Sequence, residues 1–162
     1  MTGNGNGFTT CLWFNGHAEA AAHYYLSVFK DGKLGRTGYY NEASPGTAGD
    51  VMVVEFEING QKFVGLNGGP QFPFTEAISF QIHCADSAEA DYYYDTLTGD
   101  GGKESACGWV KDKFGVSWQV IPAGAIELIS DPDPGRAARA TAAMMKMKKL
   151  DVEQMRRAAD GA

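Results

Sequence analysis

The chain has 162 residues, of which 44% are hydrophobic and 21% charged, and its net charge is −6 at neutral pH with a pI near 5.0. This length and composition favour one globular domain with its own core over a disordered chain. The acidic balance excludes nucleic acid and anionic membrane surfaces as partners, because binding to either requires a basic face. No run of about 18 apolar residues predicts a membrane span.

The cysteine content and the N-terminus indicate where the protein works. Cys11, Cys84 and Cys107 form an odd set with no CxxC pair, which favours free thiols in a reducing compartment over a disulfide framework. Glycine and asparagine alternate over residues 3–7 with nothing to bury, so residues 1–7 predict a flexible tail. The same residues lack the charged start and apolar stretch of a signal peptide. We therefore expect a cytoplasmic protein.

The first half of the chain predicts the order strand, helix and three strands. The predicted elements are strands 9–14, 34–40, 51–58 and 61–66 and a helix over 17–29. Asn15 or Gly16 is expected to cap the start of this helix. Asn59-Gly60 predicts a two-residue hairpin between the last two strands.

The second half repeats this order. The predicted elements are a strand over 77–84, a helix from a capping box at 86–89 to about residue 97, and strands at 109–110 and 116–121. Similar residues recur 69 positions apart, in the pairs Thr10/Ser79, Ala21/Ala90, Tyr24/Tyr93, Tyr25/Tyr94 and Val28/Leu97. The repeat predicts a duplicated βαβββ unit.

The composition changes after Pro122. A Pro- and Asp-rich break at 131–135 precedes an Ala- and Met-rich helix to about Lys148, and a capping box at 151–154 opens a short final helix. The predicted fold is α+β, with two βαβββ modules (8–70 and 76–122, together 8–122) that form a cup-shaped mixed sheet. Residues 123–162 are a helical extension of the same domain, packed on its body or across a dimer.

Four stretches together resemble one protein family. They are Phe14–Ala21 with Tyr24 and Tyr25, Leu66–Pro70, Ile78–Gln81 and Cys107–Gln119. They resemble the PhnB-like proteins of the vicinal oxygen chelate superfamily, which includes glyoxalase I and the bleomycin and fosfomycin resistance proteins. This branch is often labelled 3-demethylubiquinone-9 3-methyltransferase. The resemblance also implies a homodimer, which would cover the exposed sheet edges.

The resemblance bears on metal binding. Metal-using members of the superfamily carry their ligands on the first and last strands of each module. Here those positions fall on Thr10, Ser79 and Gln119, with the fourth near Val64 or Gly65. Hydroxyls and an amide are poor ligands for divalent ions, so we expect no metal and no other cofactor.

Strand alternation predicts which side chains line the cup. Gln81 and His83 share a face with Ser79, and Glu55 lies on the less apolar face of its strand. The predicted ligand-binding residues are Phe14, Glu55, Asn67, Phe72, Gln81, His83, Trp109 and Gln119. A mostly apolar pocket with a few polar groups suits a small aromatic or amphiphilic molecule. His83 and Glu55 also fit solvated surface positions, and both glutamines fit a role in satisfying buried backbone groups.

Three functions follow from these features, and the sequence leaves open whether the protein is an enzyme. The favoured one is a protein that binds a small organic molecule in the cup without metal. The alternative is a metal-dependent lyase, isomerase or dioxygenase with other ligands, for example His83 with Glu55. The least favoured is an S-adenosylmethionine-dependent methyltransferase, because no Gly-rich turn connects a strand to a helix. Cys107 fits a packed thiol better than a nucleophile, since no histidine is adjacent to it in sequence.

Overall fold

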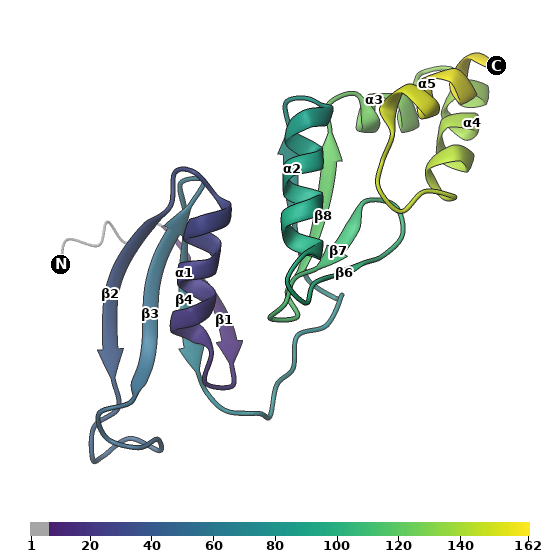
Figure 1. Cartoon of the computed structure of the whole chain (residues 1–162). Coiled ribbons are helices and arrows are strands. Elements are labelled where there is room, and N and C mark those ends of the chain that lie inside the picture. Colours follow the sequence, from purple (N-terminus) through teal and green to yellow (C-terminus); the bar gives the residue numbers. More distant parts are fainter. Residues whose placement is uncertain (1–6) are drawn as a thin grey trace. The chain divides into compact units, whose positions relative to one another are not determined.

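The structure is a computed structural model that describes residues 7–162 (Figure 1). The chain folds into two compact units that meet at the bond between Pro73 and Phe74. Apart from Gly7, the predicted N-terminal tail lies outside the described residues.

The first unit is a four-stranded mixed sheet with one helix. Its elements are β1 (Thr10–Phe14), α1 (Ala18–Val28), β2 (Lys33–Tyr39), β3 (Val51–Ile58) and β4 (Gln61–Asn67). The strand order is β1-β4-β3-β2, in which β1 runs parallel to β4 and the other pairs are antiparallel. Both residues of the Asn59-Gly60 turn have positive φ, as a tight hairpin requires, which confirms this predicted turn.

The second unit repeats this arrangement. Its elements are β5 (Ser79–Cys84), α2 (Ser87–Thr98), β6 (Lys103–Glu104), β7 (Trp109–Lys111) and β8 (Ser117–Pro122), with the strand order β5-β8-β7-β6. The pair β5–β8 is parallel and the others are antiparallel, as in the first unit. The predicted α+β class and the duplicated βαβββ unit are therefore confirmed. The two-residue strand β6 was not predicted.

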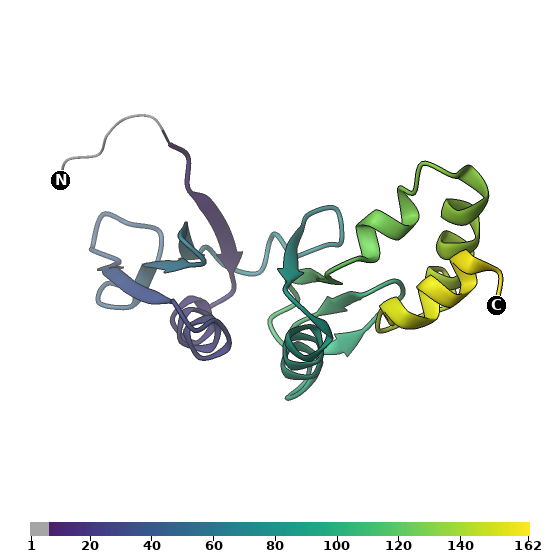
Figure 2. The ribbon, with the colours of Figure 1, turned by 90° about the horizontal axis from the view of Figure 1, so that it is seen from above.

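Each helix packs on one face of its own sheet, and Figure 2 shows both helices end-on. In the first unit, β-strand alternation directs Val54, Phe56 and Phe63 toward α1, where all three are buried. The rings of Phe56 and Phe63 stack at 5.2 Å, and Tyr25 of α1 stacks on Phe56 at 5.9 Å. Each such side chain contributes about 1.5–3 kcal/mol by leaving water.

The connection between the first strand and the helix is one residue shorter in the second unit than in the first. Asn15–His17 connects β1 to α1, whereas the shorter Ala85–Asp86 connects β5 to α2. Thr10 consequently alternates with Leu12 and Phe14 on the helix-packed face, but Ser79 lies on the opposite face from the buried Ile82. The predicted equivalence of Thr10 and Ser79 is wrong, because a one-residue shift reverses the face of every side chain in a strand.

The start of α1 is capped from β4. His17 occupies the N-cap position, but its side chain does not cap the helix. The Oδ1 atom of Asn67 instead accepts the N–H of Ala18 at 2.9 Å. The Nδ2 atom of Asn67 donates to the carbonyl oxygen of Val51 at 3.0 Å. A cap by Asn15 or Gly16 was predicted and is wrong. One amide side chain thus ties the helix to two strands.

We predict that Asn67→Ala lowers the free energy of unfolding by about 1–3 kcal/mol, because it leaves two partly buried backbone groups without partners. Asn15→Ala is the matched control and should change this free energy by less than about 0.5 kcal/mol. Urea unfolding followed by circular dichroism measures both. A larger effect at Asn15 would contradict the assignment of the cap to Asn67.

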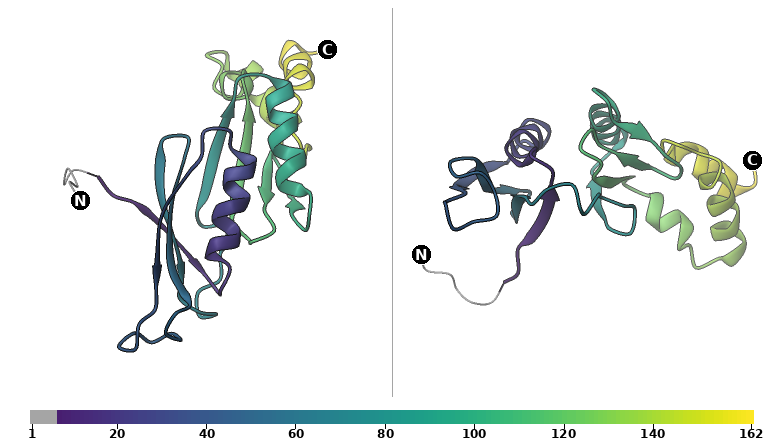
Figure 3. Two further views of the ribbon diagram at one scale, coloured as in Figure 1. Left: turned by 60° about the vertical axis from the view of Figure 1, so that its left-hand side comes forward. Right: turned by 90° about the horizontal axis from the view of Figure 1, so that it is seen from below.

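The tail forms three helices that gather in one group (Figure 3). They are α3 (Ala125–Ile129), which was not predicted, α4 (Pro134–Met144) and α5 (Val152–Asp160). Their cluster of buried residues also takes in one residue of β8; its members are Ile121, Ala125, Leu128, Ala140, Met147, Val152, Met155 and Ala159. Lys149 pairs with Asp91 at 2.7 Å and Asp95 at 3.1 Å on α2, so the tail packs on the body of its own unit.

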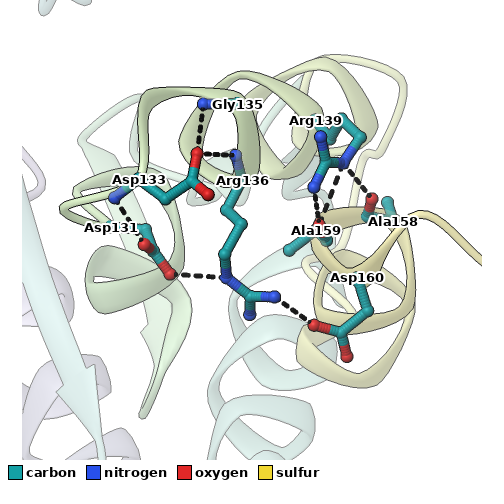
Figure 4. A network of polar contacts seen from close by, with 8 residues as sticks. All are labelled: Asp131, Asp133, Gly135, Arg136, Arg139, Ala158, Ala159 and Asp160. Carbon is teal, nitrogen blue, oxygen red and sulfur yellow. Dashed lines mark hydrogen bonds and ion pairs between the residues drawn. The ribbon is translucent and has the colours of Figure 1, made fainter.

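Polar contacts join the two ends of the tail (Figure 4). Arg136 of α4 donates from Nε to Asp131 at 3.0 Å and also pairs with Asp160 at the end of α5. The Nε atom of Arg139 donates to the carbonyl oxygen of Ala159 at 2.9 Å. The pKa of the Asp131 carboxyl is lowered, mainly because it accepts the backbone N–H of Asp133. The guanidinium of Arg136 is the second cause.

We predict that the tail loses stability in acid. A carboxyl whose pKa is lowered by folding stabilises the folded state above its ordinary pKa and loses this contribution as the pH falls. The melting temperature should therefore fall between pH 5 and pH 3, as measured by calorimetry. Arg136→Gln removes one of the causes, so its melting temperature should fall less over this range. An equal fall in both proteins would contradict the role of Arg136.

Candidate functional site

Each sheet has a second face that its own helix does not cover, called here its open face. On the first sheet, the open-face residues of β1, β3 and β4 are Cys11, Trp13, Val51, Val53, Glu55, Glu57, Lys62, Val64 and Leu66. On the second sheet, those of β5, β7 and β8 are Ser79, Gln81, His83, Trp109, Lys111, Ser117, Gln119 and Ile121. Polar side chains that can bond a ligand are concentrated on the second of these faces.

Three predicted ligand-binding residues form one row across the second sheet. Gln119 is the register partner of Gln81 on one side and of Trp109 on the other. The Nε2 atom of Gln81 donates to Oε1 of Gln119 at 3.3 Å, and Nε2 of Gln119 donates to Oγ of Ser79 at 2.8 Å. The two glutamines thus bond side chains, and the alternative that they satisfy buried backbone groups is wrong.

His83 lies one step further along the same face of β5, opposite Ile121. Its imidazole is exposed, and no hydrogen-bond partner for it occurs among the residues that the structure describes. Its position therefore fits both a ligand contact and the solvated strand end considered from the sequence.

The hairpin between β7 and β8 is held by a buried carboxylate. Asp112 is only 3% exposed, and its Oδ2 atom accepts the indole N–H of Trp118 at 2.9 Å. Its Oδ1 atom accepts the N–H groups of Phe114 at 2.9 Å and Val116 at 3.1 Å. These bonds fix the register that places Trp109 beside Gln119. Asp112 was not predicted as a site residue, although an aspartate three residues before a turn glycine in Cys107–Gln119 indicates such a cap.

We predict that Asp112→Ala destabilises the protein by about 3 kcal/mol, because it leaves an indole N–H and two buried backbone N–H groups unpaired. Asp100→Asn is the matched control. Asp100 pairs with Lys113 at 2.5 Å in solvent, so its loss should change stability much less than the loss of Asp112 does. Urea unfolding monitored by tryptophan fluorescence measures both. Equal effects would show that Asp112 is not the anchor of the hairpin.

The predicted residues of the first unit have other surroundings. Glu55 lies on its open face and pairs with Arg36 of β2 at 3.0 Å. Phe72 is 64% exposed, and its ring meets that of Trp13 edge-on at 4.9 Å. Phe14 is 3% exposed on the helix-packed face, so the prediction that it walls a pocket on the open face is wrong. Asn67 is committed to capping α1.

The first unit also has a hollow of about 590 Å³ at the end of its sheet. It is lined by Asn15, Gly16, Glu19, Tyr40, Pro45, Gly46, Thr47, Asp50, Val51, Asn67, Gly68, Gly69 and Gln71. The hydroxyl of Tyr40 donates to the carbonyl oxygen of Asn67, and Gly46 lies against the Tyr40 ring. The carboxylates of Glu19 and Asp50 stand at the exposed surface. Most of this lining is backbone or solvated, which gives a ligand few fixed side chains.

The donors on the described part of the chain fit a divalent ion poorly. Between residues 7 and 162, no group of three or more His, Cys, Asp and Glu side chains is placed to hold a metal ion. The open face of the second sheet offers amides, hydroxyls and the single imidazole of His83. Divalent ions such as zinc, manganese and iron are bound in proteins mainly by several imidazole or carboxylate ligands.

Cys11 is exposed, whereas the thiols of Cys84 and Cys107 are packed against other groups. The Sγ atom of Cys107 lies 3.7 Å from both the carbonyl oxygen of Met144 and the sulfur of Met145. The pKa of the Cys84 thiol is raised to about 11, mainly by burial, so this thiol is protonated at neutral pH.

Among the described helices, none is long and apolar enough to cross a membrane.

Paired βαβββ units with these strand orders define the glyoxalase/bleomycin-resistance fold of the vicinal oxygen chelate superfamily. Within it, the family model described as 3-demethylubiquinone-9 3-methyltransferase matches residues 6–121. The chain belongs to this family, the PhnB-like branch of the superfamily.

Solved structures agree with this assignment. A PhnB protein from Bacillus cereus is 34% identical, with a TM-score of 0.62 over 69% of this chain and 95% of its own. Protein PA1353 from Pseudomonas aeruginosa is 22% identical, with a TM-score of 0.55 over 68% of this chain and 92% of its own. A variant of the fosfomycin resistance protein FosX from Listeria monocytogenes, complexed with Mn(II) and 1S,2S-dihydroxypropylphosphonic acid, is 17% identical. Its TM-score is 0.50 over 75% of this chain and 95% of its own.

Among curated proteins, none is significantly similar to this chain. Of the three structures named above, those of PA1353 and the FosX variant support the fold alone, at 22% and 17% identity. The Bacillus cereus protein, at 34% identity, also supports the family.

Proposed function

We propose that this protein binds a small organic molecule on the open face of its second sheet, without a divalent metal ion. The observation that carries the proposal is the row Gln81–Gln119–Trp109. It joins an indole to two hydrogen-bonded amides on adjacent strands.

The chemistry of the row indicates the kind of ligand. The Trp109 indole is half-buried and offers an apolar surface on which a ring of the ligand can lie. The amide of each glutamine has both donor and acceptor capacity beyond the bonds that it makes in the protein. A small ring compound with polar substituents can lie on the indole and bond the amides, as expected of a mostly apolar site with a few placed polar groups.

A metal-dependent reaction has less support. The FosX variant binds Mn(II), but at 17% identity the likeness to this chain extends to the fold alone. Glu55, one of the two ligands considered for such a site, is already neutralised by Arg36. The amides and hydroxyls near Trp109 are weak ligands for a divalent ion.

The family description names a methyltransferase, but the chain lacks the usual cradle for S-adenosylmethionine. Such a cradle is a Gly-rich turn between a strand and the following helix. The two connections of this kind in the paired units are Asn15–His17 and Ala85–Asp86, and together they contain one glycine. We therefore propose ligand binding and not methyl transfer as the function of this scaffold.

We further propose that the protein is a homodimer. The sheet orders leave β1 and β2 as the edge strands of the first sheet and β5 and β6 as those of the second, and such edges favour association with another strand or chain. Light scattering at micromolar concentration should give twice the mass of the chain. A monomeric mass would contradict this proposal and leave the binding row unaffected.

We predict that a screen of neutral and acidic ring compounds yields ligands whose affinity depends on the row. Trp109→Ala and Gln119→Ala should each weaken binding by about tenfold, the effect of losing about 1.4 kcal/mol. The exposed Gln154 of α5 supplies the matched control, and Gln154→Ala should not alter binding. Calorimetric titration of each variant measures these affinities.

Two further measurements separate the alternatives. Elemental analysis of protein purified without a histidine tag should find no stoichiometric metal, and titration with S-adenosylmethionine should release no heat. Stoichiometric zinc, manganese or iron would instead favour the metal-dependent enzyme. Ligands that bind equally well to wild type and Trp109→Ala would contradict the proposed site.

A further inference from the structure

A second row of polar side chains runs beside the first on the same open face. In the register of the sheet, Ser117 of β8 pairs with Lys111 of β7 on one side and with Ser79 of β5 on the other. The row Lys111–Ser117–Ser79 therefore places one ammonium group on β7 beside two hydroxyls on the next two strands, β8 and β5. It adjoins Trp109, which lies two residues before Lys111 on the same face of β7.

The Ser117 hydroxyl is an unexplained group in this row. Ser117 is only 2% exposed, and its Oγ atom is buried without a hydrogen-bond partner. It is the only buried side-chain nitrogen or oxygen in this state among the residues that the structure describes. A buried polar atom without a partner destabilises the folded state, and a ligand group bonded to Ser117, between a lysine and a second serine, would remove this cost.

The groups around Ser79 and Ser117 show that both hydroxyls can donate a hydrogen bond to a ligand. The Oγ atom of Ser79 accepts the Nε2 donation of Gln119 at 2.8 Å, which leaves the Ser79 hydroxyl hydrogen available to donate. Ser117 and Lys111 supply further donors on the same side of the sheet. A group that accepts hydrogen bonds and carries negative charge matches three such donors.

The protein itself provides a model of that group. The Lys111 ammonium pairs with the carboxylate of Glu76, which lies in the segment that leads into β5. This ion pair lowers the pKa of Glu76, so the carboxylate stays charged at neutral pH. Glu76 is 66% exposed, and an ion pair in solvent is weak enough for a competing anion to displace.

We propose that Lys111, Ser117 and Ser79 form an oxyanion subsite for a carboxylate, phosphonate or sulfonate group of the ligand, and that Glu76 is its internal counterion. The subsite rests on the proposed function, because the ring of the same ligand lies on Trp109. When the ligand binds, its anionic group takes the place of the Glu76 carboxylate on Lys111 and accepts the hydroxyl donation of Ser117. The ligand class is therefore a small ring compound with an acidic substituent.

The test uses three ring probes that differ in one substituent: benzoate, phenylphosphonate and the neutral benzamide. Binding to the full chain is followed by chemical-shift changes of the backbone amides. Both anions should bind more tightly than benzamide. The ratio between the two anions shows whether the subsite prefers a planar carboxylate or a tetrahedral phosphonate.

Variants assign the effect to the row. Lys111→Gln should weaken the preferred anion by about tenfold or more, and Ser117→Ala by about three- to tenfold. Glu76→Gln removes the internal competitor and should tighten the anion by about two- to fivefold. None of the three should change the affinity for benzamide. Lys113→Gln is the matched control, because the ammonium of Lys113 pairs with Asp100, and it should leave all affinities unchanged.

The thermal stability of Ser117→Ala provides a second readout. If the hydroxyl has no partner within the protein, its removal should leave the melting temperature unchanged or raise it. A lower melting temperature would overturn the subsite, since Ser117 would then have a structural role. If benzamide and benzoate bind with equal affinity, and Trp109→Ala weakens both, the oxyanion subsite is overturned but the proposed function stands. If Trp109→Ala weakens the binding of no probe, both the subsite and the proposed function are overturned.

Discussion

The period-two alternation of side chains along each strand is the constraint on which the rest of this protein depends. A helix can bury only one face of a four-stranded sheet, and in each unit the buried face takes the large apolar residues, such as Phe56 and Phe63 under Tyr25. Because that packing supplies the stability, residues on the other face are free to vary in chemistry. The rows that contain Gln119 and Ser117 are a consequence of this division of roles.

Local chemistry made much of the fold predictable. Asn59-Gly60 can take up positive φ at both positions, and the side chains of Asp86 and Asp151 accept the N–H groups that open their helices. These elements depend on residues within four positions of one another. The face assignments of Gln81, Gln119 and Trp109 were equally accessible, because alternation needs only the parity of each position within its strand.

The parts that could not be predicted depend on contacts between distant residues. Asn67 caps a helix that begins 49 positions earlier, so the nearer Asn15 was the natural choice from sequence. The missing residue between β5 and α2 placed Thr10 and Ser79 on opposite faces, and no pattern within either strand reveals it. Asp112 lies within the most characteristic stretch of the family, but its partner Trp118 is identified only once β7 and β8 are paired.

The duplication explains why one sheet and not both would bind a ligand. In the register of the sheets, Cys11, Val64 and Glu55 occupy the places that Gln81, Gln119 and Trp109 occupy in the second unit. In the next row, Glu57 stands where the second unit has Lys111, which reverses the charge. Glu55 and Glu57 are paired with Arg36 and Lys33, so the first sheet satisfies its own charges across neighbouring strands. Only the second copy keeps an ammonium, a buried hydroxyl and an indole side by side, and its one bound carboxylate comes from an exposed segment that can leave.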